Sequence, residues 1–328
     1  MQTRLLTPEG PNVSEIGFDG WGVENSSAEP TPETAEATIH AAIDCGINLF
    51  DTSNGDGNGS VNQAIAAALA IRTEKVCVVT QTPPADGPWP PSPYCRWQDR
   101  YSAAYLREKV HHQLQDLNRD HIDLLQLQTW TAAWNDDPQP LLVLRQLKEQ
   151  GKIGMIGVTA PEHDQSCVIQ LMRDGLIDVV QIVFNLFQQE AAAQILPVAQ
   201  ETGTGVLVRA ALDRNSLTEM FEAGTSFAEG NVHHNFFQGD RQDRTTRRVA
   251  EIRRDLEQFG IDEQYTLSEV ALKFVLARPE IGSVMIGMQS AQQVEQHCRA
   301  PARRDLSPEF LQHLRRHDWR RGVWTLGK

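Results

Sequence analysis

The sequence predicts an α/β fold, a (β/α)8 barrel formed by one domain over residues 1–328, and three observations support this. Short runs of apolar and β-branched residues alternate with longer amphipathic segments along the chain. The short runs are continuously apolar, which is typical of parallel strands covered by helices. A GxGxxG sequence after the first strand, which would favour an open dinucleotide-binding sheet, is absent. The length suits one large barrel with a substantial core.

Seven of the short runs are predicted to be buried strands, and an eight-stranded barrel needs one more. The predicted strands are INLFD (47–51), VCVVT (76–80), IDLLQLQ (122–128), IGMIGVT (153–159), VVQIVF (179–184), GVLVR (205–209) and SVMIG (283–287).

The segments between these strands are predicted to be helices. In the first, Thr31 is a suitable N-cap, Pro32 takes the first helical position and Gly46 ends the helix before the next strand. The other predicted helices span residues 61–71, 102–117, 140–150, 163–175, 191–203, 247–260 and 266–277.

Two segments interrupt this alternation and are predicted to be long loops. Residues 82–100 are too rich in proline for a helix, and residues 213–245 are polar with several Gly, Asn and His. Each follows a strand, so in a barrel both loops lie at the C-terminal end, where ligands bind. No change in composition marks a linker, which favours a single domain.

Composition restricts the class of partner. The formal net charge is −13, with 43 acidic against 30 basic residues, which argues against nucleic acid and anionic membrane as partners. No apolar run is long enough to cross a bilayer, and the first residues lack the apolar stretch of a secretory signal. The five cysteines are dispersed, as expected for free thiols in a cytoplasmic protein. The oligomeric state is left open.

Several ordered motifs resemble those of the aldo-keto reductases. They are AAIDCGINLFDTS (41–53), DLNRDHIDLLQLQ (116–128), GKIGMIGVT (151–159) and QIVFN (181–185). The resemblance covers nearly the whole chain. It implies a barrel that binds a nicotinamide cofactor and a small-molecule substrate. It also implies carbonyl reduction, in which an Asp, a Tyr, a Lys and a His act together.

Only one of these four catalytic residue types is retained. Asp51 matches the Asp, whereas Asp56, Gln81 and Gln128 stand where the resemblance places Tyr, Lys and His. Without a nearby cation, repulsion between two carboxylates and their burial should leave a proton on one of them. Asp51 and Asp56 are therefore the predicted proton-handling pair, although Asp56 also suits a solvated turn.

Other residues at the predicted ligand end are expected to position the substrate. Gln81 and Gln128 can orient a ligand by hydrogen bonds but cannot transfer a proton at neutral pH. Trp130 suits either core packing or an apolar ligand pocket. Arg209 suits a carboxylate partner, an acidic ligand group or packing. No metal site is predicted, and the pair His313 and His317, flanked by arginines, is interpreted as part of a solvated basic helix.

The resemblance also assigns residues to the cofactor. The basic residue expected at the 2′-phosphate of NADP is missing, because Gln289 and Gln293 lie there. The sequence therefore leaves both NADP and NAD open. The predicted cofactor-binding residues are Thr159, Gln181, Asn185, Gly287 and Gln293.

Three functions remain open at this point. The loss of three catalytic residue types favours a divergent enzyme that uses acid–base chemistry on a small molecule, in an elimination, isomerisation or cyclisation. The first alternative is an NAD(P)H-dependent oxidoreductase with Asp56 as the substitute proton donor. The second is a catalytically inactive binding or regulatory pseudoenzyme.

Overall fold

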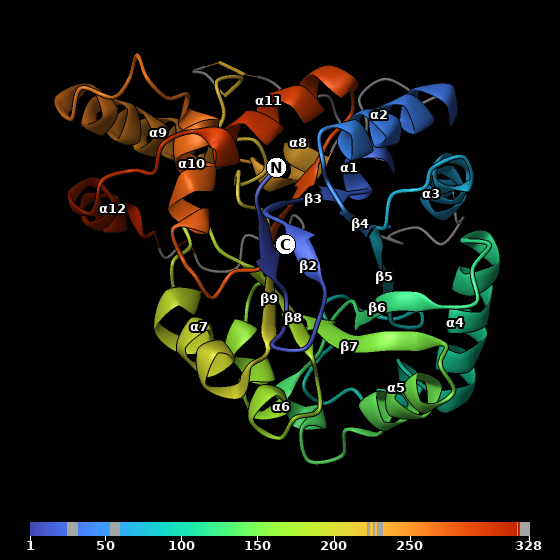
Figure 1. Ribbon diagram of the computed structural model, residues 1–328. Helices are drawn as coiled ribbons and strands as arrows, with labels where there is room; N and C mark the ends of the chain where they lie inside the picture. The colour runs from blue at the N-terminus through green and yellow to red at the C-terminus, as the bar shows by residue number, and fades with distance from the viewer. Residues whose placement is uncertain are drawn as a thin grey trace.

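The computed structural model describes residues 1–24, 32–52, 60–221, 224–225, 227, 232–319 and 321. Within these residues, parallel strands close into a barrel in the order β10-β3-β4-β5-β6-β7-β8-β9, surrounded by helices (Figure 1). The predicted (β/α)8 fold is confirmed. The barrel strands are β3 (Ile16–Asp19), β4 (Leu49–Asp51), β5 (Cys77–Thr82), β6 (Ile122–Leu127), β7 (Ile153–Thr159), β8 (Val179–Val183), β9 (Gly205–Arg209) and β10 (Ser283–Gly287).

Helices follow the strands and cover the outside of the barrel. Most of the longer ones overlap predicted segments, and α11 is a long helix that was not among them. The helix expected from residue 163 is divided into a 3-10 turn and the short α6. The helices are α1 (Trp21–Glu24), α2 (Pro32–Asp44), α3 (Ser60–Ala70), α4 (Ala103–Asp116), α5 (Gln139–Glu149), α6 (Ile169–Arg173), α7 (Ala191–Thr202), α8 (Val232–Phe236), α9 (Arg241–Gln258), α10 (Leu267–Leu276), α11 (Ala291–Ala302) and α12 (Pro308–Leu314).

Local sequence explains where these helices begin and end. The Ser102 hydroxyl caps α4 by accepting from the backbone N–H of Tyr105. Thr266 and Glu269 form a reciprocal capping box at α10. Gly46, after α2, has a φ of +85°, the left-handed conformation that favours glycine. The predicted N-cap Thr31 lies outside the described residues.

Two expectations about the last third of the chain are corrected. The segment 213–245 is not loop throughout, because it contains α8 and the first turn of α9. Phe236 and Phe237, buried in contact with each other, anchor α8. The basic C-terminal helix is also not fully solvated: His317 is 1% exposed and its Nε2 lies 2.7 Å from Oδ2 of buried Asp255.

The N-terminal end of the barrel is closed by a hairpin of β1 (Thr3–Leu5) and β2 (Asn12–Ser14), which lies across its centre in Figure 1. Val13 in β2 and Leu6 just after β1 join the apolar cluster inside the barrel. Gly205 permits this approach, since a Cβ there would lie 2.5 Å from the Leu6 carbonyl oxygen.

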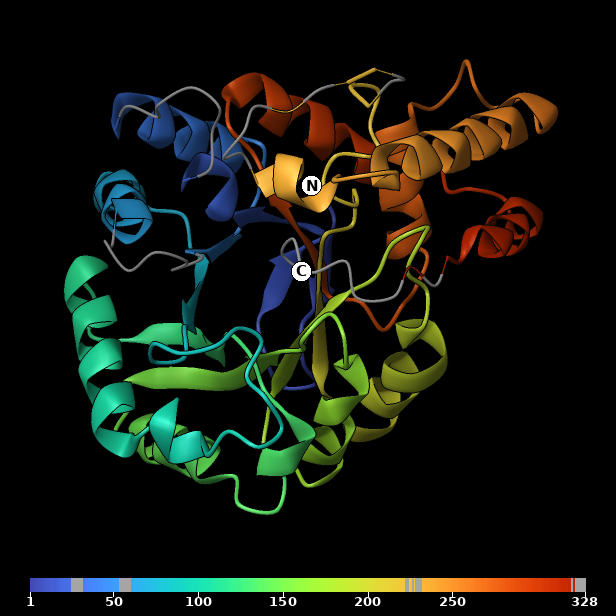
Figure 2. The ribbon, with the colours of Figure 1, turned by 180° about the vertical axis from the view of Figure 1, so that it is seen from behind.

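The C-terminal end carries the longer connections. Figure 2 shows it, with the β5–α4 segment and α8 in front of the barrel. The segment after β5, where the proline-rich loop was predicted, holds only a 3-10 turn before α4. No helix among the described residues is long and apolar enough to span a membrane.

Candidate active site

The candidate site is a layer of polar side chains at the C-terminal end of the barrel. Below it, an apolar cluster that includes Leu49, Val79, Leu124, Val179 and Leu207 fills the interior. Alternate residues of a strand face the same side, so the residue two positions further along each strand also faces the barrel axis. These following residues are Asp51, Gln81, Gln126, Gln181 and Arg209.

Asp51 is held by two carboxamides. It ends β4 and is 1% exposed, and its Oδ2 accepts hydrogen bonds from Gln81 Nε2 at 2.8 Å and from Gln181 Nε2 at 3.1 Å. Two N–H donors on one carboxylate oxygen favour its ionised form, because a neutral acid accepts more weakly. The structure therefore brings together three residues that the sequence predicted for the site.

Thr159, at the end of β7, connects these carboxamides. Its hydroxyl lies 3.2 Å from Gln81 Oε1 and 3.5 Å from Oε1 of both Gln126 and Gln181. Gln126 is fully buried, and its Nε2 has no hydrogen-bond partner among the described residues. A buried donor without an acceptor is costly, so this amide is suited to a ligand oxygen.

Arg209 brings a cation to the same layer from the end of β9. Its Nη2 donates to the Ala160 carbonyl at 3.2 Å, while its Nε has no partner among the described residues. Burial lowers the pKa of its guanidinium, and the nearby Glu162 carboxylate opposes that change. Arginine remains charged in proteins, so Arg209 presents a positive group to anionic or carbonyl ligands.

Asp19 is, with Gln126, a site residue that the sequence analysis missed. It ends β3, the strand left unassigned, and its Cα pairs with Asp51 on β4 and with Gly287 on β10. Its Oδ1 accepts from the backbone N–H of Trp21 at 3.0 Å. Burial, and then the charge of Asp51, raise the pKa of Asp19 to about 7, against the opposing effects of the Trp21 N–H and Arg209.

A signal for Asp19 is present in the sequence. The run IGFD at 16–19 ends in Asp after apolar residues, as NLFD at 48–51 does. The run is short and contains a glycine, which weakens the strand pattern. Gln126 was detectable too, because it alternates with Leu124 and Gln128 along one face of β6.

The remaining predicted cofactor residues lie at the same end of the barrel, but two of them already form hydrogen bonds within the protein. Asn185 holds the turn after β8: its Oδ1 accepts from two backbone N–H groups at 2.9 Å, and its Nδ2 donates to the Ala210 carbonyl. Gly287 ends β10. Gln293, in the first turn of α11, accepts from the Gln289 N–H at 2.8 Å and donates its own N–H to Ser290 Oγ.

Three other predicted residues are less directly connected. Gln128 is half-buried just beyond β6, and its backbone N–H donates to the Thr82 carbonyl. Trp130 is 1% exposed and packs edge-on against Trp134, with its Nε1 donating to Asn135. This places Trp130 within packed side chains. Asp56 lies outside the described residues.

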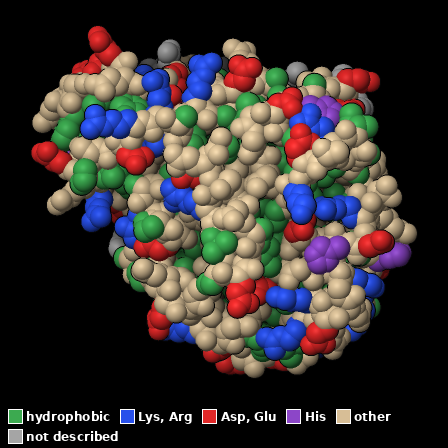
Figure 3. Space-filling model, viewed as in Figure 1, with side chains coloured by type: hydrophobic (Ala, Val, Ile, Leu, Met, Phe, Trp, Pro, Cys, Tyr) green, Lys and Arg blue, Asp and Glu red, His purple; other side chains and the backbone are tan. Residues whose placement is uncertain are grey.

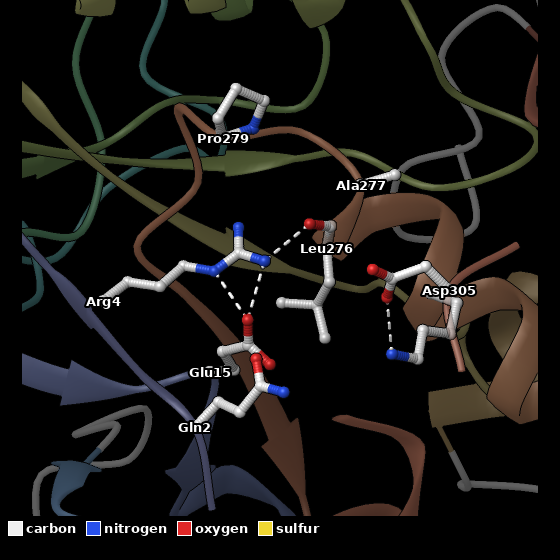
Figure 4. A pocket seen from close by; sticks show the side chains of 8 residues that line it. Gln2, Arg4, Glu15, Leu276, Ala277, Pro279 and Asp305 are labelled. Atoms are coloured by element: carbon white, nitrogen blue, oxygen red, sulfur yellow. Dashed lines mark hydrogen bonds and ion pairs between the residues drawn. The ribbon is translucent and has the colours of Figure 1, made fainter. Parts of the chain in front are cut away.

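A cavity of about 440 Å³ lies at the opposite, N-terminal end (Figure 4). There Arg4 donates to Glu15 and to three backbone carbonyls, and Lys273 donates to Asp305. Figure 3, which views this end, shows acidic and basic side chains interspersed. The charged side chains that line the N-terminal cavity already have partners.

Comparison with known proteins agrees with this architecture. The chain is 24% identical to the "Uncharacterized oxidoreductase YqkF" of Bacillus subtilis, covering 97% of this chain and 96% of that protein. It is also 24% identical to an NADH-specific methylglyoxal reductase of Escherichia coli, covering 88% and 90% of the two chains. A holo-form aldo-keto reductase of Bacillus halodurans shares the fold with a TM-score of 0.76 at 22% identity, over all of both chains.

The names of these relatives bear on the class of reaction. They are oxidoreductases and reductases, which supports oxidoreductase chemistry over the predicted elimination, isomerisation or cyclisation. The comparisons therefore favour the oxidoreductase class of the first alternative over the leading prediction, while the role of Asp56 in that alternative stays a prediction. The match to the aldo/keto reductase family extends over residues 15–318. The chain therefore belongs to the aldo/keto reductase family.

Proposed function

We propose that this protein is an NAD(P)H-dependent oxidoreductase that interconverts a carbonyl and an alcohol on a small polar molecule. The observation that carries the proposal is the pairing of Thr159 and Gln181. They are Cα partners on adjacent strands, their side chains lie 3.5 Å apart, and the resemblance assigns both to a nicotinamide carboxamide. They lie in the polar layer that also contains Asp51.

The donors in this layer fit a nicotinamide cofactor. Gln126 Nε2 and Arg209 Nε are buried and lack partners among the described residues, and a carboxamide or carbonyl oxygen can accept from them. Thr159 and Gln181 would hold the carboxamide, and Gly287 with the first turn of α11 would receive the phosphates. When bound, the cofactor supplies or accepts the hydride.

The chain's own residues would bind and orient the substrate. Gln81 and Gln181 fix Asp51 as an ionised carboxylate through its Oδ2. Arg209 provides a cation for the oxygen that becomes more negative as a carbonyl is reduced. The polarity of the layer favours a small substrate with several oxygens over an apolar one.

The cofactor is expected to be NADH rather than NADPH. The first turn of α11 has no basic residue, and its Gln293 side chain is used on the Gln289 backbone. A 2′-phosphate there would lack a charge-assisted donor. The Escherichia coli relative carries an NADH-specific name, which agrees with this expectation.

The test is binding followed by turnover. Binding of NADH and NADPH to the purified protein is measured by tryptophan fluorescence quenching, with calorimetry as a check. Consumption of each cofactor is then followed with methylglyoxal, small sugars and hydroxyketones. Saturable NADH binding with carbonyl-dependent oxidation would support the proposal. Failure of both cofactors to bind at millimolar concentration would reject it and favour the pseudoenzyme alternative.

A further inference from the structure

We infer that Asp19 is the proton-exchanging acid of this site, beside the Asp51 carboxyl that two carboxamides hold in place. The inference rests on the proposed function only for the identity of the oxygen that receives the proton. The sequence analysis gave this role to Asp56. The inference gives it to Asp19, which lies on β3, a strand that the sequence analysis did not assign.

The two carboxyls are neighbours by register. Asp19 and Asp51 are Cα partners on adjacent parallel strands, and each lies at the C-terminal end of its strand. Paired residues of a parallel sheet project to the same face. Asp51 faces the barrel axis above Leu49, and Asp19 follows Gly17, where a Cβ would meet the inward-facing Met285 side chain. Both carboxyls therefore project toward the same polar layer.

Their hydrogen-bond environments differ. Asp51 Oδ2 receives two carboxamide N–H donors, whereas the bond to Asp19 comes from the single backbone N–H of Trp21. The donors stabilise negative charge on Asp51, and that charge disfavours a second one on Asp19. Two carboxyls whose surroundings separate them in this way divide into a fixed anion and an acid.

The charged groups around Asp19 are consistent with that division. Asp51 on β4 raises the pKa of Asp19, and Arg209 on β9 lowers it, while the neighbour on β10 is the uncharged Gly287. With burial as the largest effect, the pKa of Asp19 rises to about 7, where an acid can both donate and regain a proton at neutral pH.

The proton transfer balances with carbonyl reduction. As the carbonyl carbon gains a hydride from reduced nicotinamide, the C=O π bond breaks and the oxygen forms an O–H bond with the proton of Asp19. Asp19 is left as a carboxylate beside Arg209 and regains a proton from solvent. In the reverse direction Asp19 accepts the hydroxyl proton of an alcohol.

Asp19→Asn isolates this role. The asparagine keeps an oxygen that can accept from the Trp21 N–H but has no acidic proton to give. Asp262→Asn, at an exposed position of the chain, is the matched control, and Asp56→Asn tests the earlier assignment. The readouts are carboxyl NMR of 13C-labelled aspartate and the pH profile of NADH oxidation with methylglyoxal, from about pH 5 to pH 9.

We expect one aspartate to titrate near neutral pH in the wild type and in Asp262→Asn, and this titration to be absent from Asp19→Asn. We also expect kcat/KM to fall about 100-fold in Asp19→Asn, with NADH affinity changed less than about threefold. Absence of such a titration, or its persistence in Asp19→Asn, would overturn the inference. So would loss of the pH dependence in Asp56→Asn but not in Asp19→Asn.

Failure of the proposed function is distinguishable from failure of the inference. If the wild type neither binds nor oxidises NADH or NADPH, the oxidoreductase proposal fails. The NMR titration then still decides whether Asp19 exchanges the proton of this site, because it needs no cofactor.

Discussion

Arg4 and Arg209 lie at opposite ends of the same barrel, and their guanidinium groups differ in how many of their hydrogen-bond donors have partners. At the N-terminal end, Arg4 donates to Glu15 and to the Leu276 carbonyl (Figure 4). It also donates to the carbonyls of Arg278 and Ile281. At the C-terminal end, Arg209 donates to one carbonyl and keeps an unpartnered buried Nε within the described residues.

The difference separates stability from function within one fold. Arg4 uses all three nitrogens of its guanidinium to hold the N-terminal end closed, and Arg278 Nε, Glu280 Oε2 and Ser283 Oγ are the buried atoms near it that have no partner among the described residues. The C-terminal end retains the buried donors Gln126 Nε2 and Arg209 Nε and a carboxyl with a raised pKa, which lower stability unless a ligand compensates them.

Arg4→Ala should reduce the free energy of unfolding by about 3 kcal/mol, because it leaves Glu15 buried without its cation and removes the donor to the Leu276 and Ile281 carbonyls, while the Arg278 carbonyl keeps the Ile281 N–H. Urea denaturation followed by circular dichroism measures this change. Arg254→Ala, on an exposed face of α9, is the control and should change stability by less than about 0.5 kcal/mol. NADH affinity should be unaffected by Arg4→Ala. Equal stability of the two variants would contradict a stabilising role for the N-terminal end.

Asp19→Asn should have the opposite effect on stability, and only at higher pH. Because the pKa of Asp19 is raised to about 7 in the folded state, its contribution to stability is present at low pH and is lost as pH rises from about 4 through 7. The asparagine variant lacks this loss. Its free energy of unfolding should exceed that of the wild type by on the order of 2 kcal/mol at pH 8, a figure that includes a discount for partial exposure. At pH 5 the two free energies should approach each other.

Urea denaturation at the two pH values measures the effect of Asp19→Asn. Asp262→Asn should follow the pH dependence of the wild type, because its side chain is exposed. If the curves of Asp19→Asn and the wild type ran parallel between these pH values, the carboxyl would not carry the raised pKa.

Regular patterns explain how much of the fold the sequence could predict. IGMIGVT, GVLVR and SVMIG match β7, β9 and β10 at both ends, because continuous apolar residues mark strands buried on both faces. The strand β3 was not predicted, since its role depends on pairing with β4 and β10, which are distant in sequence. The helix α8 was not predicted because buried Phe236 and Phe237 stabilise it within an otherwise polar segment.

The candidate site was predictable in part, because sequence motifs identify positions but not the contacts that the folded backbone creates. Motif positions located Asp51, Gln81, Thr159 and Gln181, and these do form one hydrogen-bonded group. Motifs could not reveal that Asn185 is used by the turn after β8, because that depends on the three-dimensional path of the backbone. The pairing of Asp19 with Asp51 needed the register of the closed barrel.

Gln81→Leu should weaken catalysis without unfolding the protein. It removes the 2.8 Å hydrogen bond to Asp51 and the oxygen that faces Thr159. Loss of one donor to a carboxylate costs about 1.5 kcal/mol, so kcat/KM for NADH-dependent reduction of methylglyoxal should fall about tenfold. Gln258→Leu, on the exposed end of α9, is the matched control. Unchanged kcat/KM in Gln81→Leu would show that Asp51 needs no such support.

Gln289→Arg tests whether the C-terminal end lacks only a cation to accept a 2′-phosphate. The substitution keeps the backbone N–H that donates to Gln293 and adds a guanidinium next to the first turn of α11. An added charge–phosphate contact is worth about 1 kcal/mol, so the ratio of NADPH to NADH affinity should rise about fivefold. Gln296→Arg, which adds the same charge further along α11, should leave the ratio unchanged. Equal ratios in both variants would place the phosphate site elsewhere on the barrel.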